Sequence, residues 1–407
     1  MNILLTSREA LFPNYGGHRE YLLSTVRQLS SLGHLVTIIS WGPEDDYEYF
    51  EKNLVETHFK TVKNPFKTES YEINPKLRNI LSSLGAGQVR TIFHKGLKPE
   101  RLKNFGNFEL VIKNGPDSNS IGEYVAQKLN VPIIERLDWV GIPYRSKNYK
   151  IWLKYIGKKN TPFDIIHSKV DYAVTKLEAM SIHNATTVYT HSMHDAEKIS
   201  KFLPTEKISY ILPYLSNDSE NEKISDESAL SILPRKYYLF YSSLNIDSLI
   251  ALTVVLKLSK KYPRLNFVLT GTNFGDLPRR PNLYSLGEVH LDSFLDILKG
   301  AYAVIFPIVQ SHGIQMKLIR AFSMGKAVLT TNTLIRPMDH LVKNYENIFV
   351  SDEPHGFEKT LTNIDEDEEA VERVGNNSYL MYIKNFSKEV HRTNLDKYIK
   401  RYSNKYE

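Results

Sequence analysis

Three basic side chains stand close together in the second half of this chain, around the start of a predicted helix. Lys317 and Arg320 are three residues apart, so they share one face of a helix that begins at about Gln315. His312 lies on the loop before that helix, next to Gly313. Backbone N–H groups at a helix start attract anions, and nearby cations strengthen the attraction. The cluster therefore predicts a binding site for a phosphate or diphosphate group.

The segments around this cluster alternate between strand and helix patterns. Short apolar strands are predicted at residues 303–307 and 327–330, each followed or preceded by a turn that contains glycine. The segment before the first strand has the spacing of an amphipathic helix, with apolar residues at Leu291, Phe294, Leu295 and Leu298. Such alternation is typical of βαβ units and a parallel sheet. Ligands of parallel sheets bind at the carboxyl ends of the strands, where this loop lies.

A similar unit opens the chain. A strand at residues 3–6 leads through Gly16 and Gly17 into a helix at residues 18–32. Gly33 follows, as a residue that ends a helix in the left-handed conformation would, and a second strand is predicted at residues 35–40.

Both units resemble glycosyltransferases of the GT-B fold, family 4 type. The second unit matches at Gly313, Lys317, Ala321, Gly325, Lys326 and Val328. The first matches in its pair of glycines before the helix and its Leu-Gly-His sequence after it. His312 and Arg320 occupy the positions of the two glutamates of the family's donor site. The resemblance implies an α/β protein: two Rossmann-like, doubly wound parallel-sheet domains with an interdomain cleft and a C-terminal helix that crosses back.

The domain limits follow from this resemblance and from composition. We expect an N-terminal acceptor-binding domain at 1–215, a connection at 216–235 and a C-terminal donor-binding domain at 236–385. The helix at 386–407 should pack back on the first domain. The polar, acidic stretch 217–227 lacks an apolar period and supports the connection. Further strands are predicted at 110–113, 131–135, 187–190, 208–212, 237–241 and 266–270, and helices at 193–202 and 248–262.

The resemblance also assigns donor-site residues. The family's first turn of the donor domain supplies two cations, but the matching residues here are neutral. They are Ser242, Ser243 and Asn245, which can still donate hydrogen bonds. Lys317 and Arg320 are the candidates that replace these cations at the leaving group. The loop from Gly287 to Val289 matches one whose backbone reads the base edge. The expected donor-binding residues are Ser242, Ser243, Asn245, Gly271, Gly287, Val289, Gly313, Ile314, Gln315 and Lys317, with His312, Arg320 and Asp138 as catalytic candidates.

Fewer sequence features indicate where the acceptor would bind in the first domain. Gly16 and Gly17 would allow a ligand to approach the backbone at the helix start, and His18 could join them. Asp138 follows a predicted strand, at a position where relatives often carry a histidine, and Asp117 follows another. Either aspartate could orient an acceptor hydroxyl or act as a base. The alternative for both is an N-cap or turn aspartate, which carries more weight for Asp117 than for Asp138.

Composition narrows the class of protein. The chain has 407 residues, a formal net charge of +6 and no cysteine, which excludes disulfides and thiolate metal sites. Its histidines are scattered, and we predict neither a metal site nor a cofactor. No apolar run reaches the roughly 18 residues of a membrane span, and we expect a cytoplasmic protein. Basic residues gather at 60–103 and 145–159. The second stretch, with interleaved aromatics, would fit an anionic membrane surface or a plain solvated face.

The function predicted from these features is transfer of a sugar from a nucleotide-sugar donor to a glycan or lipid-linked acceptor, with retention and without a metal. The alternative is a catalytically silent GT-B subunit that binds a glycan or protein partner in a transferase complex. Charge alone is too weak a ground for nucleic-acid binding, which we do not expect. Homo- or hetero-oligomers remain open.

Overall fold

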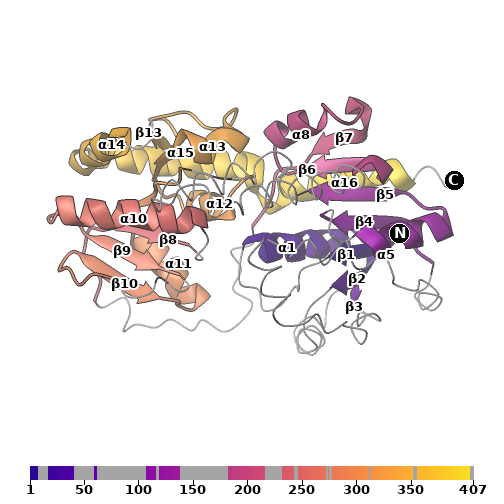
Figure 1. The fold of residues 1–407 in the computed structure, drawn as a ribbon, viewed down its shortest axis with the longest axis horizontal. Helices are drawn as coiled ribbons and strands as arrows, with labels where there is room; N and C mark the ends of the chain where they lie inside the picture. The colour runs from indigo at the N-terminus through magenta and orange to yellow at the C-terminus, as the bar shows by residue number, and fades with distance from the viewer. Residues whose placement is uncertain are drawn as a thin grey trace, which may run out of the picture. The chain divides into compact units, whose positions relative to one another are not determined.

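The structure is a computed structural model of the whole chain. It describes residues 1–7, 17–40, 59–61, 107–115, 119–137, 182–215, 232–242, 246–271, 274, 277–309, 311, 313–351 and 355–403. The chain forms two compact units (Figure 1). Unit 1 comprises Met1–Leu212 and Arg392–Glu407, and unit 2 comprises Pro213–His391. The predicted domain limits at 215 and 386 lie near these boundaries, and most of the predicted connection at 216–235 lies outside the described residues.

Unit 1 is built on a parallel sheet whose order is β3-β2-β1-β4-β5-β6-β7. Figure 1 shows β2, β1, β4, β5 and β6 side by side in that order. The chain thus runs outward from β1 in one direction and then returns to continue in the other, which is the doubly wound pattern. The strands are β1 (Asn2–Ser7), β2 (Leu35–Ser40), β3 (Phe59–Thr61), β4 (Leu110–Asn114), β5 (Ile133–Leu137), β6 (Thr187–Thr190) and β7 (Ile208–Tyr210).

The two faces of this sheet bury different residues because successive side chains on a strand point to opposite sides. Ile3 and Leu5 of β1 face α1 (Gly17–Ser31) and α16 (Lys388–Ser403), whereas Leu4 faces the side that holds α5 (Asn119–Leu129) and α8 (Met193–Ile199). Gly33, at φ +84°, ends α1 as expected. With apolar residues on both faces, the strands form a continuous buried layer, as parallel sheets require.

The last helix, α16, belongs to the core of unit 1. Leu395, Tyr398, Ile399 and Tyr402 pack in the same apolar cluster as Ile3 and Leu5. The Tyr398 hydroxyl lies 2.8 Å from the Thr187 hydroxyl, at the start of β6. The expectation that the C-terminal helix crosses back to the first domain is therefore confirmed.

A buried ion pair links β4 to β5. Lys113 Nζ lies 2.8 Å from a carboxylate oxygen of Glu135 and 3.0 Å from one of Glu123. Lys113 and Glu135 have no exposed side-chain surface. Gly122 of α5 makes room for the lysine, because a Cβ atom there would lie 2.9 Å from Lys113 Cγ. Charges buried this deeply are tolerated only in pairs.

We expect the change Lys113→Met to destabilise unit 1 by about 3–5 kcal/mol, since it leaves Glu135 buried without its cation. The double change Lys113→Met with Glu135→Met should recover most of that loss, because it removes both charges. Urea denaturation followed by circular dichroism would measure the difference. Equal stability of the single and double variants would contradict the importance of the pair.

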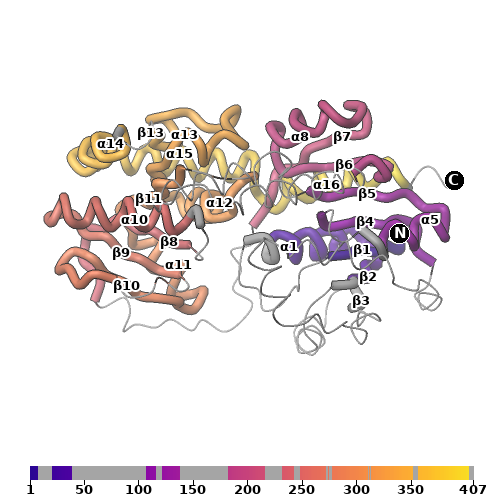
Figure 2. The backbone as a smooth tube through the Cα atoms, in the orientation of Figure 1, coloured from indigo at the N-terminus to yellow at the C-terminus, as the bar shows by residue number. Residues whose placement is uncertain are grey.

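Unit 2 repeats the architecture with the sheet order β10-β9-β8-β11-β12-β13, again with parallel pairs. Figure 2 shows β10, β9, β8 and β11 following one another in that order. Its strands are β8 (Tyr238–Tyr241), β9 (Phe267–Thr270), β10 (Leu283–Gly287), β11 (Ala303–Phe306), β12 (Val328–Thr331) and β13 (Phe349–Ser351). Its helices are α10 (Ile246–Lys261), α11 (Leu291–Gly300), α12 (Met316–Ser323), α13 (Asn332–Ile335), α14 (His355–Glu366) and α15 (Glu368–Phe386). The predicted α/β class with two doubly wound parallel sheets is thus confirmed.

The middle of α15 packs closely against the turn that follows α12. A Cβ atom at Gly375 of α15 would overlap the carbonyl oxygen of Gly325, the residue at φ +65° that turns the chain after α12. Ser378 also donates a hydrogen bond to the Lys326 carbonyl, at 3.2 Å. The position of α12, which carries Lys317 and Arg320, is therefore set by its contact with α15.

Candidate donor site

In unit 2, the carboxyl ends of three neighbouring strands meet through backbone contacts. The N–H of Ser242, just after β8, bonds the Thr270 carbonyl of β9 at 3.2 Å. The N–H of Gly271 bonds the Gly287 carbonyl of β10 at 2.8 Å. Gly271 has φ +142°, and a Cβ atom there would overlap the carbonyl oxygen of Ser242. Glycine therefore lets these strand ends come together at the edge where parallel sheets bind ligands.

Lys317 points to the same edge. Its ammonium group donates a hydrogen bond to the Ser242 hydroxyl at 2.9 Å and lies 5.4 Å from the centre of the Phe306 ring, at the end of β11. The Ser242 hydroxyl in turn lies 2.5 Å from that of Ser248, which is buried near the start of α10. The positive charge of Lys317 is thus held at the ends of β8 and β11.

Tyr241, the last residue of β8, holds the start of α12 against the sheet. Its hydroxyl donates a hydrogen bond to the Lys317 carbonyl at 2.6 Å. Its ring makes edge contacts with Phe294 at 4.8 Å and Phe306 at 5.1 Å between ring centres. These contacts hold the ring in one orientation, so the hydroxyl can set the height of the helix start above the sheet.

The start of α12 has the geometry of an anion site. Gln315, its N-cap residue, is extended and makes no side-chain capping bond, and the first turn carries no acidic residue. Gly313, at φ +58°, turns the chain just before it. The first N–H groups of any helix have no partner within the helix, and they carry a partial positive charge. Beside the Lys317 ammonium group, they would favour a phosphate.

Arg320 takes a different place on the same helix. It is buried, and it lies close enough to Tyr382 of α15 for its charge to act on that hydroxyl. Burial raises the pKa of Tyr382 to about 12, and the nearby Arg320 guanidinium opposes part of that rise. The structure therefore brings Lys317 to the end of β8 and Arg320 to the contact between α12 and α15.

The other expected donor residues lie on the same side of unit 2. Gly287 has φ +65° and ends β10, Val289 follows it half-buried, and Ile314 and Gln315 are half-buried before α12. Several expected site residues lie outside the described residues. These are Gly16, Asp117, Asp138, Ser243, Asn245, His312 and the segment 145–159. For Gly17 and His18 the structure gives only the backbone, at the start of α1.

The sequence interpretation missed a buried polar cluster in unit 1. A guanidinium nitrogen of Arg136 donates to the Asn114 side-chain oxygen, and the Asn114 amide donates to the Ser7 hydroxyl at 3.3 Å. The Arg136 guanidinium lies 4.4 Å from the ring centre of Tyr21, which also contacts His191 at 4.3 Å. These side chains come from the carboxyl ends of four strands and from α1. A basic residue within an apolar strand was the signal that could have indicated them.

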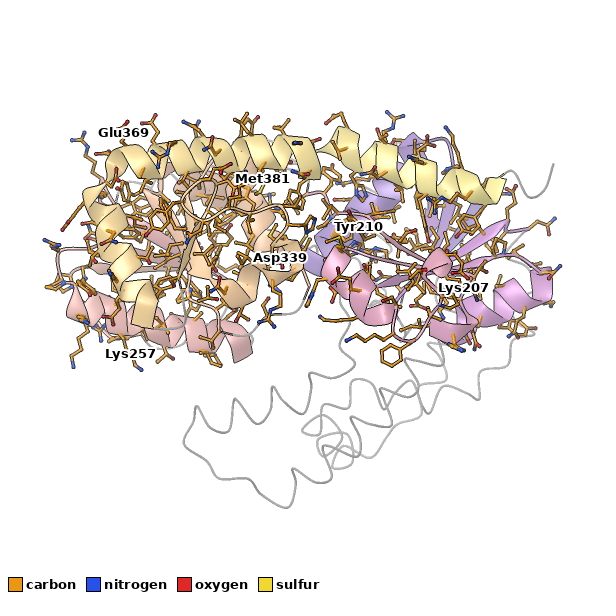
Figure 3. All side chains as sticks on the ribbon, turned by 90° about the horizontal axis from the view of Figure 1, so that it is seen from above. Lys207, Tyr210, Lys257, Asp339, Glu369 and Met381 are labelled. Carbon is orange, nitrogen blue, oxygen red and sulfur yellow. The ribbon has the colours of Figure 1, made fainter. Side chains whose placement is uncertain are left out.

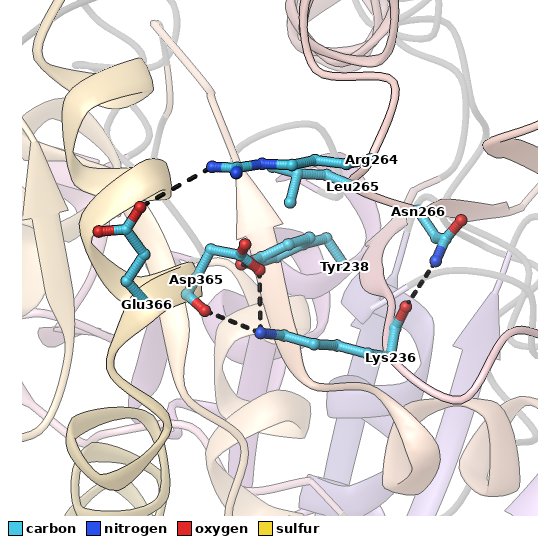
Figure 4. Close-up of a pocket in the computed structure, with 7 residues that line it drawn as sticks. All are labelled: Lys236, Tyr238, Arg264, Leu265, Asn266, Asp365 and Glu366. Carbon is cyan, nitrogen blue, oxygen red and sulfur yellow. Dashed lines mark hydrogen bonds and ion pairs between the residues drawn. The ribbon is translucent and has the colours of Figure 1, made fainter.

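A shallow pocket lies at the opposite edge of the unit 2 sheet (Figure 4). Its polar groups bind one another: Lys236 Nζ lies 2.8 Å from the Asp365 carbonyl oxygen and 3.0 Å from its carboxylate, and Tyr238 donates to that carboxylate at 2.9 Å. Burial, above all, raises the pKa of Tyr238 well above its usual value. These contacts anchor the carboxyl end of α14 to the amino ends of β8 and β9. This structural role is sufficient to explain the cluster without a bound ligand.

The residues that the structure describes, with the gaps given above, contain neither a metal site nor a membrane-spanning helix. That part of the chain contains no group of histidine, aspartate and glutamate side chains placed to hold a metal ion. It also contains no helix with the length and apolar character needed to cross a bilayer.

The tertiary structure defines the class of fold. Two Rossmann-like units with equivalent strand orders and a final helix that returns to unit 1 constitute the GT-B fold. No family model and no curated protein matches the sequence. Solved structures do match along nearly the whole chain, but at sequence identities that establish the fold alone.

Three of these solved structures illustrate the degree of similarity in fold and sequence. A sucrose-phosphate synthase from Thermosynechococcus elongatus aligns with a TM-score of 0.70 at 14% identity, covering 98% of both chains. Anabaena Alr3699/HepE in complex with UDP aligns with a TM-score of 0.65 at 12% identity, covering 98% of this chain and 100% of that one. WaaG, a glycosyltransferase involved in lipopolysaccharide biosynthesis, aligns with a TM-score of 0.60 at 14% identity, covering 97% of this chain and 98% of that one.

The role of Tyr241 can be tested by the change Tyr241→Phe. It removes one hydrogen bond to the start of α12 but keeps the ring contacts, so we expect the dissociation constant for a nucleoside diphosphate to rise roughly two- to ten-fold. The matched control is Tyr238→Phe, which loses a similar bond to Asp365 at the opposite edge of the sheet. The control should leave this dissociation constant unchanged. Equal effects of the two changes would show that Tyr241 supports the fold and not the site.

Proposed function

We propose that this protein is a glycosyltransferase that moves a sugar from a nucleotide-sugar donor to a glycan or lipid-linked acceptor. The observation that carries the proposal is the position of Lys317. Its ammonium group lies at the carboxyl ends of β8 and β11, bonded to Ser242 and next to the start of α12. A cation and a helix start at one sheet edge form the arrangement that a departing diphosphate needs.

Each part of this edge has a role in the proposed reaction. Lys317 neutralises the charge that develops on the diphosphate when the bond to the sugar breaks. The N–H groups at the start of α12 donate hydrogen bonds to its oxygens. Gly271 lets the ends of β8 and β9 come close together without a side chain between them, so that the nucleotide can approach the backbone there. Tyr241 holds α12 at the height that the phosphate requires.

The structural comparisons support the nucleotide-sugar part of the proposal. Anabaena Alr3699/HepE, whose fold this chain shares, has been crystallised with UDP and with UDP-glucose. WaaG is described as a glycosyltransferase. The same class of donor is therefore our first choice for this protein, with UDP as the first nucleotide to test.

The remaining features of the proposal rest on the resemblance and on residue chemistry. We propose a retaining, metal-independent reaction without a cofactor, since cations of the protein can take the place of a metal at the diphosphate. Arg320 and His312 would complete the positive charge around the leaving group, and Asp138 would orient the acceptor hydroxyl. Transfer would take place in the cytoplasm or on the inner membrane face.

The test is to incubate the full chain with a panel of UDP-, GDP- and ADP-sugars, with and without EDTA, and to measure release of the nucleoside diphosphate. Isothermal titration with each free diphosphate would run in parallel. We expect one nucleotide to bind in the micromolar range and its sugar derivative to be turned over in EDTA. Failure of every diphosphate to bind at millimolar concentration would disprove the donor site.

A second candidate function is that of a catalytically silent subunit in a transferase complex. It is favoured by the neutral residues Ser242, Ser243 and Asn245, in the turn where the resembled family supplies two cations, and by the burial of Arg320. A silent subunit could retain the fold and bind a glycan without turnover. Binding of a nucleotide without release of diphosphate from any donor, with a glycan array signal, would favour this function over transfer.

A further inference from the structure

The hydroxyl groups of Ser242 and Ser248 form a short hydrogen-bonded chain with the ammonium group of Lys317. Lys317 Nζ donates to the Ser242 hydroxyl at 2.9 Å, and that hydroxyl lies 2.5 Å from the hydroxyl of Ser248. A lysine ammonium group can only donate hydrogen bonds, so the Ser242 oxygen accepts this one, and the Ser242 proton is available for the Ser248 oxygen. Successive hydrogen bonds of this kind polarise and strengthen one another.

Ser248 stands on a part of unit 2 that is fixed by burial. It lies near the start of α10 and is 0% exposed. Lys257, labelled on the same helix in Figure 3, is exposed on its outer side. Ser248 comes nine residues earlier, about two and a half turns, so it occupies the opposite, inner face. Ile250 and Ala251, close to it in sequence, are also buried. This end of α10 therefore cannot move without exposing apolar surface.

Lys317 is the group that gains from such a fixed point. Its stem is long and has many rotamers, and the side chain is only partly buried on α12. The Phe306 ring, 5.4 Å from the ammonium group, attracts the charge but accepts no conventional hydrogen bond from it. A cation stabilises a developing negative charge most effectively when it is already in place before the charge appears. The hydroxyl of Ser242 gives the ammonium group that place, provided that the hydroxyl itself is held.

We infer that Ser248 is a positioning residue of the donor site, which holds the ammonium group of Lys317 through the Ser242 hydroxyl at the leaving diphosphate. Ser248 keeps the Ser242 hydroxyl in the orientation that accepts from Lys317. By accepting the Ser242 proton, it also makes the Ser242 oxygen a better acceptor. The ammonium group then meets the diphosphate with little further loss of rotamer freedom. This inference rests on the proposed function, because it states how the proposed contact to the leaving group is preorganised.

The experiment is a double-mutant cycle on the full chain, read as the dissociation constant of the tightest binder among UDP, GDP and ADP. We expect Ser248→Ala to raise this constant about three- to ten-fold, the effect of losing one hydrogen bond. In the Lys317→Met background the same change should alter it less than about two-fold, because no ammonium group remains to be positioned. Ser248→Thr, which keeps a hydroxyl, should recover most of the affinity.

The matched control is Ser259→Ala, near the other end of the same helix. Ser259 is also buried, and its hydroxyl donates to the Leu256 carbonyl at 3.0 Å. The control should lower the unfolding temperature to a similar degree as Ser248→Ala, but it should leave the dissociation constant unchanged. Should Ser248→Ala fail to fold by circular dichroism, Ser248→Cys takes its place in the cycle, since a thiol is a weak donor and acceptor of similar size.

Two results would overturn this inference and leave the donor site intact. An equal loss of affinity in both backgrounds would show that Ser248 supports the fold and not the ammonium group. No loss in the unchanged background would show that Ser242 holds Lys317 without it. Failure of the unchanged protein to bind any of the three diphosphates is a different outcome, which would disprove the proposed function and this inference together.

Discussion

Replacing Lys317 by methionine is expected to lower kcat/KM for the donor by about 10²–10³-fold, in the range found when one preorganised donor to a developing anion is removed. Methionine keeps most of the apolar stem, so packing on Phe306 persists while the charge is lost. Binding of the free nucleoside diphosphate should weaken by about ten- to a hundred-fold, since a charge-assisted hydrogen bond contributes roughly 1.5–3 kcal/mol. Steady-state kinetics and titration calorimetry measure the two effects separately.

Two further variants make this prediction specific. Lys317→Arg keeps the charge and should retain a measurable part of the activity, although the larger guanidinium group cannot reproduce the bond to Ser242. Lys257→Met removes an exposed lysine from α10 and should change neither quantity. Unchanged diphosphate affinity in Lys317→Met, with the fold intact by circular dichroism, would mean that the anion binds elsewhere.

The periodicity of the sequence was sufficient to predict most of the sheet. Strands at 35–40 and 187–190 were predicted with their final bounds, and the one at 303–307 ends one residue earlier, at Phe306. Such strands are rich in β-branched and aromatic residues and are bounded by glycine or polar residues, which is the pattern that single-sequence reasoning recognises. The predicted strand at 131–135 shows the opposite case, because β5 runs from Ile133 to Leu137.

The reason for that error lies in the side chains of β5. Arg136 is charged and directly follows the charged Glu135, so the sequence suggested that the strand ended at Glu135. In the structure Glu135 pairs with Lys113 on one face, while Arg136 meets Asn114 and Tyr21 on the other. Partners that lie far apart in the chain make these charges acceptable in the interior. No local pattern reveals such pairs, which only the strand order brings together.

The sequence suggested residues of the candidate donor site but not the contacts between them. Lys317 and Ser242 were each expected at the site, yet their hydrogen bond joins residues 75 positions apart. Arg320 shows the limit of reasoning from helix spacing. A separation of three residues places it near Lys317, but the packing of α15 determines that it is buried beside Tyr382. Two residues on one helix face can thus contact different neighbouring elements of the fold.

Replacing Gly271 by alanine is expected to abolish measurable nucleoside diphosphate binding and to destabilise unit 2 by about 3 kcal/mol or more, the range of overpacked and strained sites. The added Cβ atom would overlap the backbone carbonyl of Ser242, and backbone cannot move aside as a flexible side chain can. Either β8 or β9 must shift, and the Ser242 hydroxyl that holds Lys317 shifts with it.

The matched control for this prediction is Gly287→Ala, at the end of the neighbouring strand. Gly287 also has a positive φ, +65°, but a Cβ atom there would meet no atom within 4 Å. Its replacement should therefore lose only about 1–2 kcal/mol through backbone strain, and it should keep nucleotide binding. Thermal unfolding and diphosphate titration of both variants would separate the two causes. Equal losses of binding would mean that positive φ alone matters at this edge, whereas a selective loss in Gly271→Ala would show that the close approach of β8 and β9 forms the site.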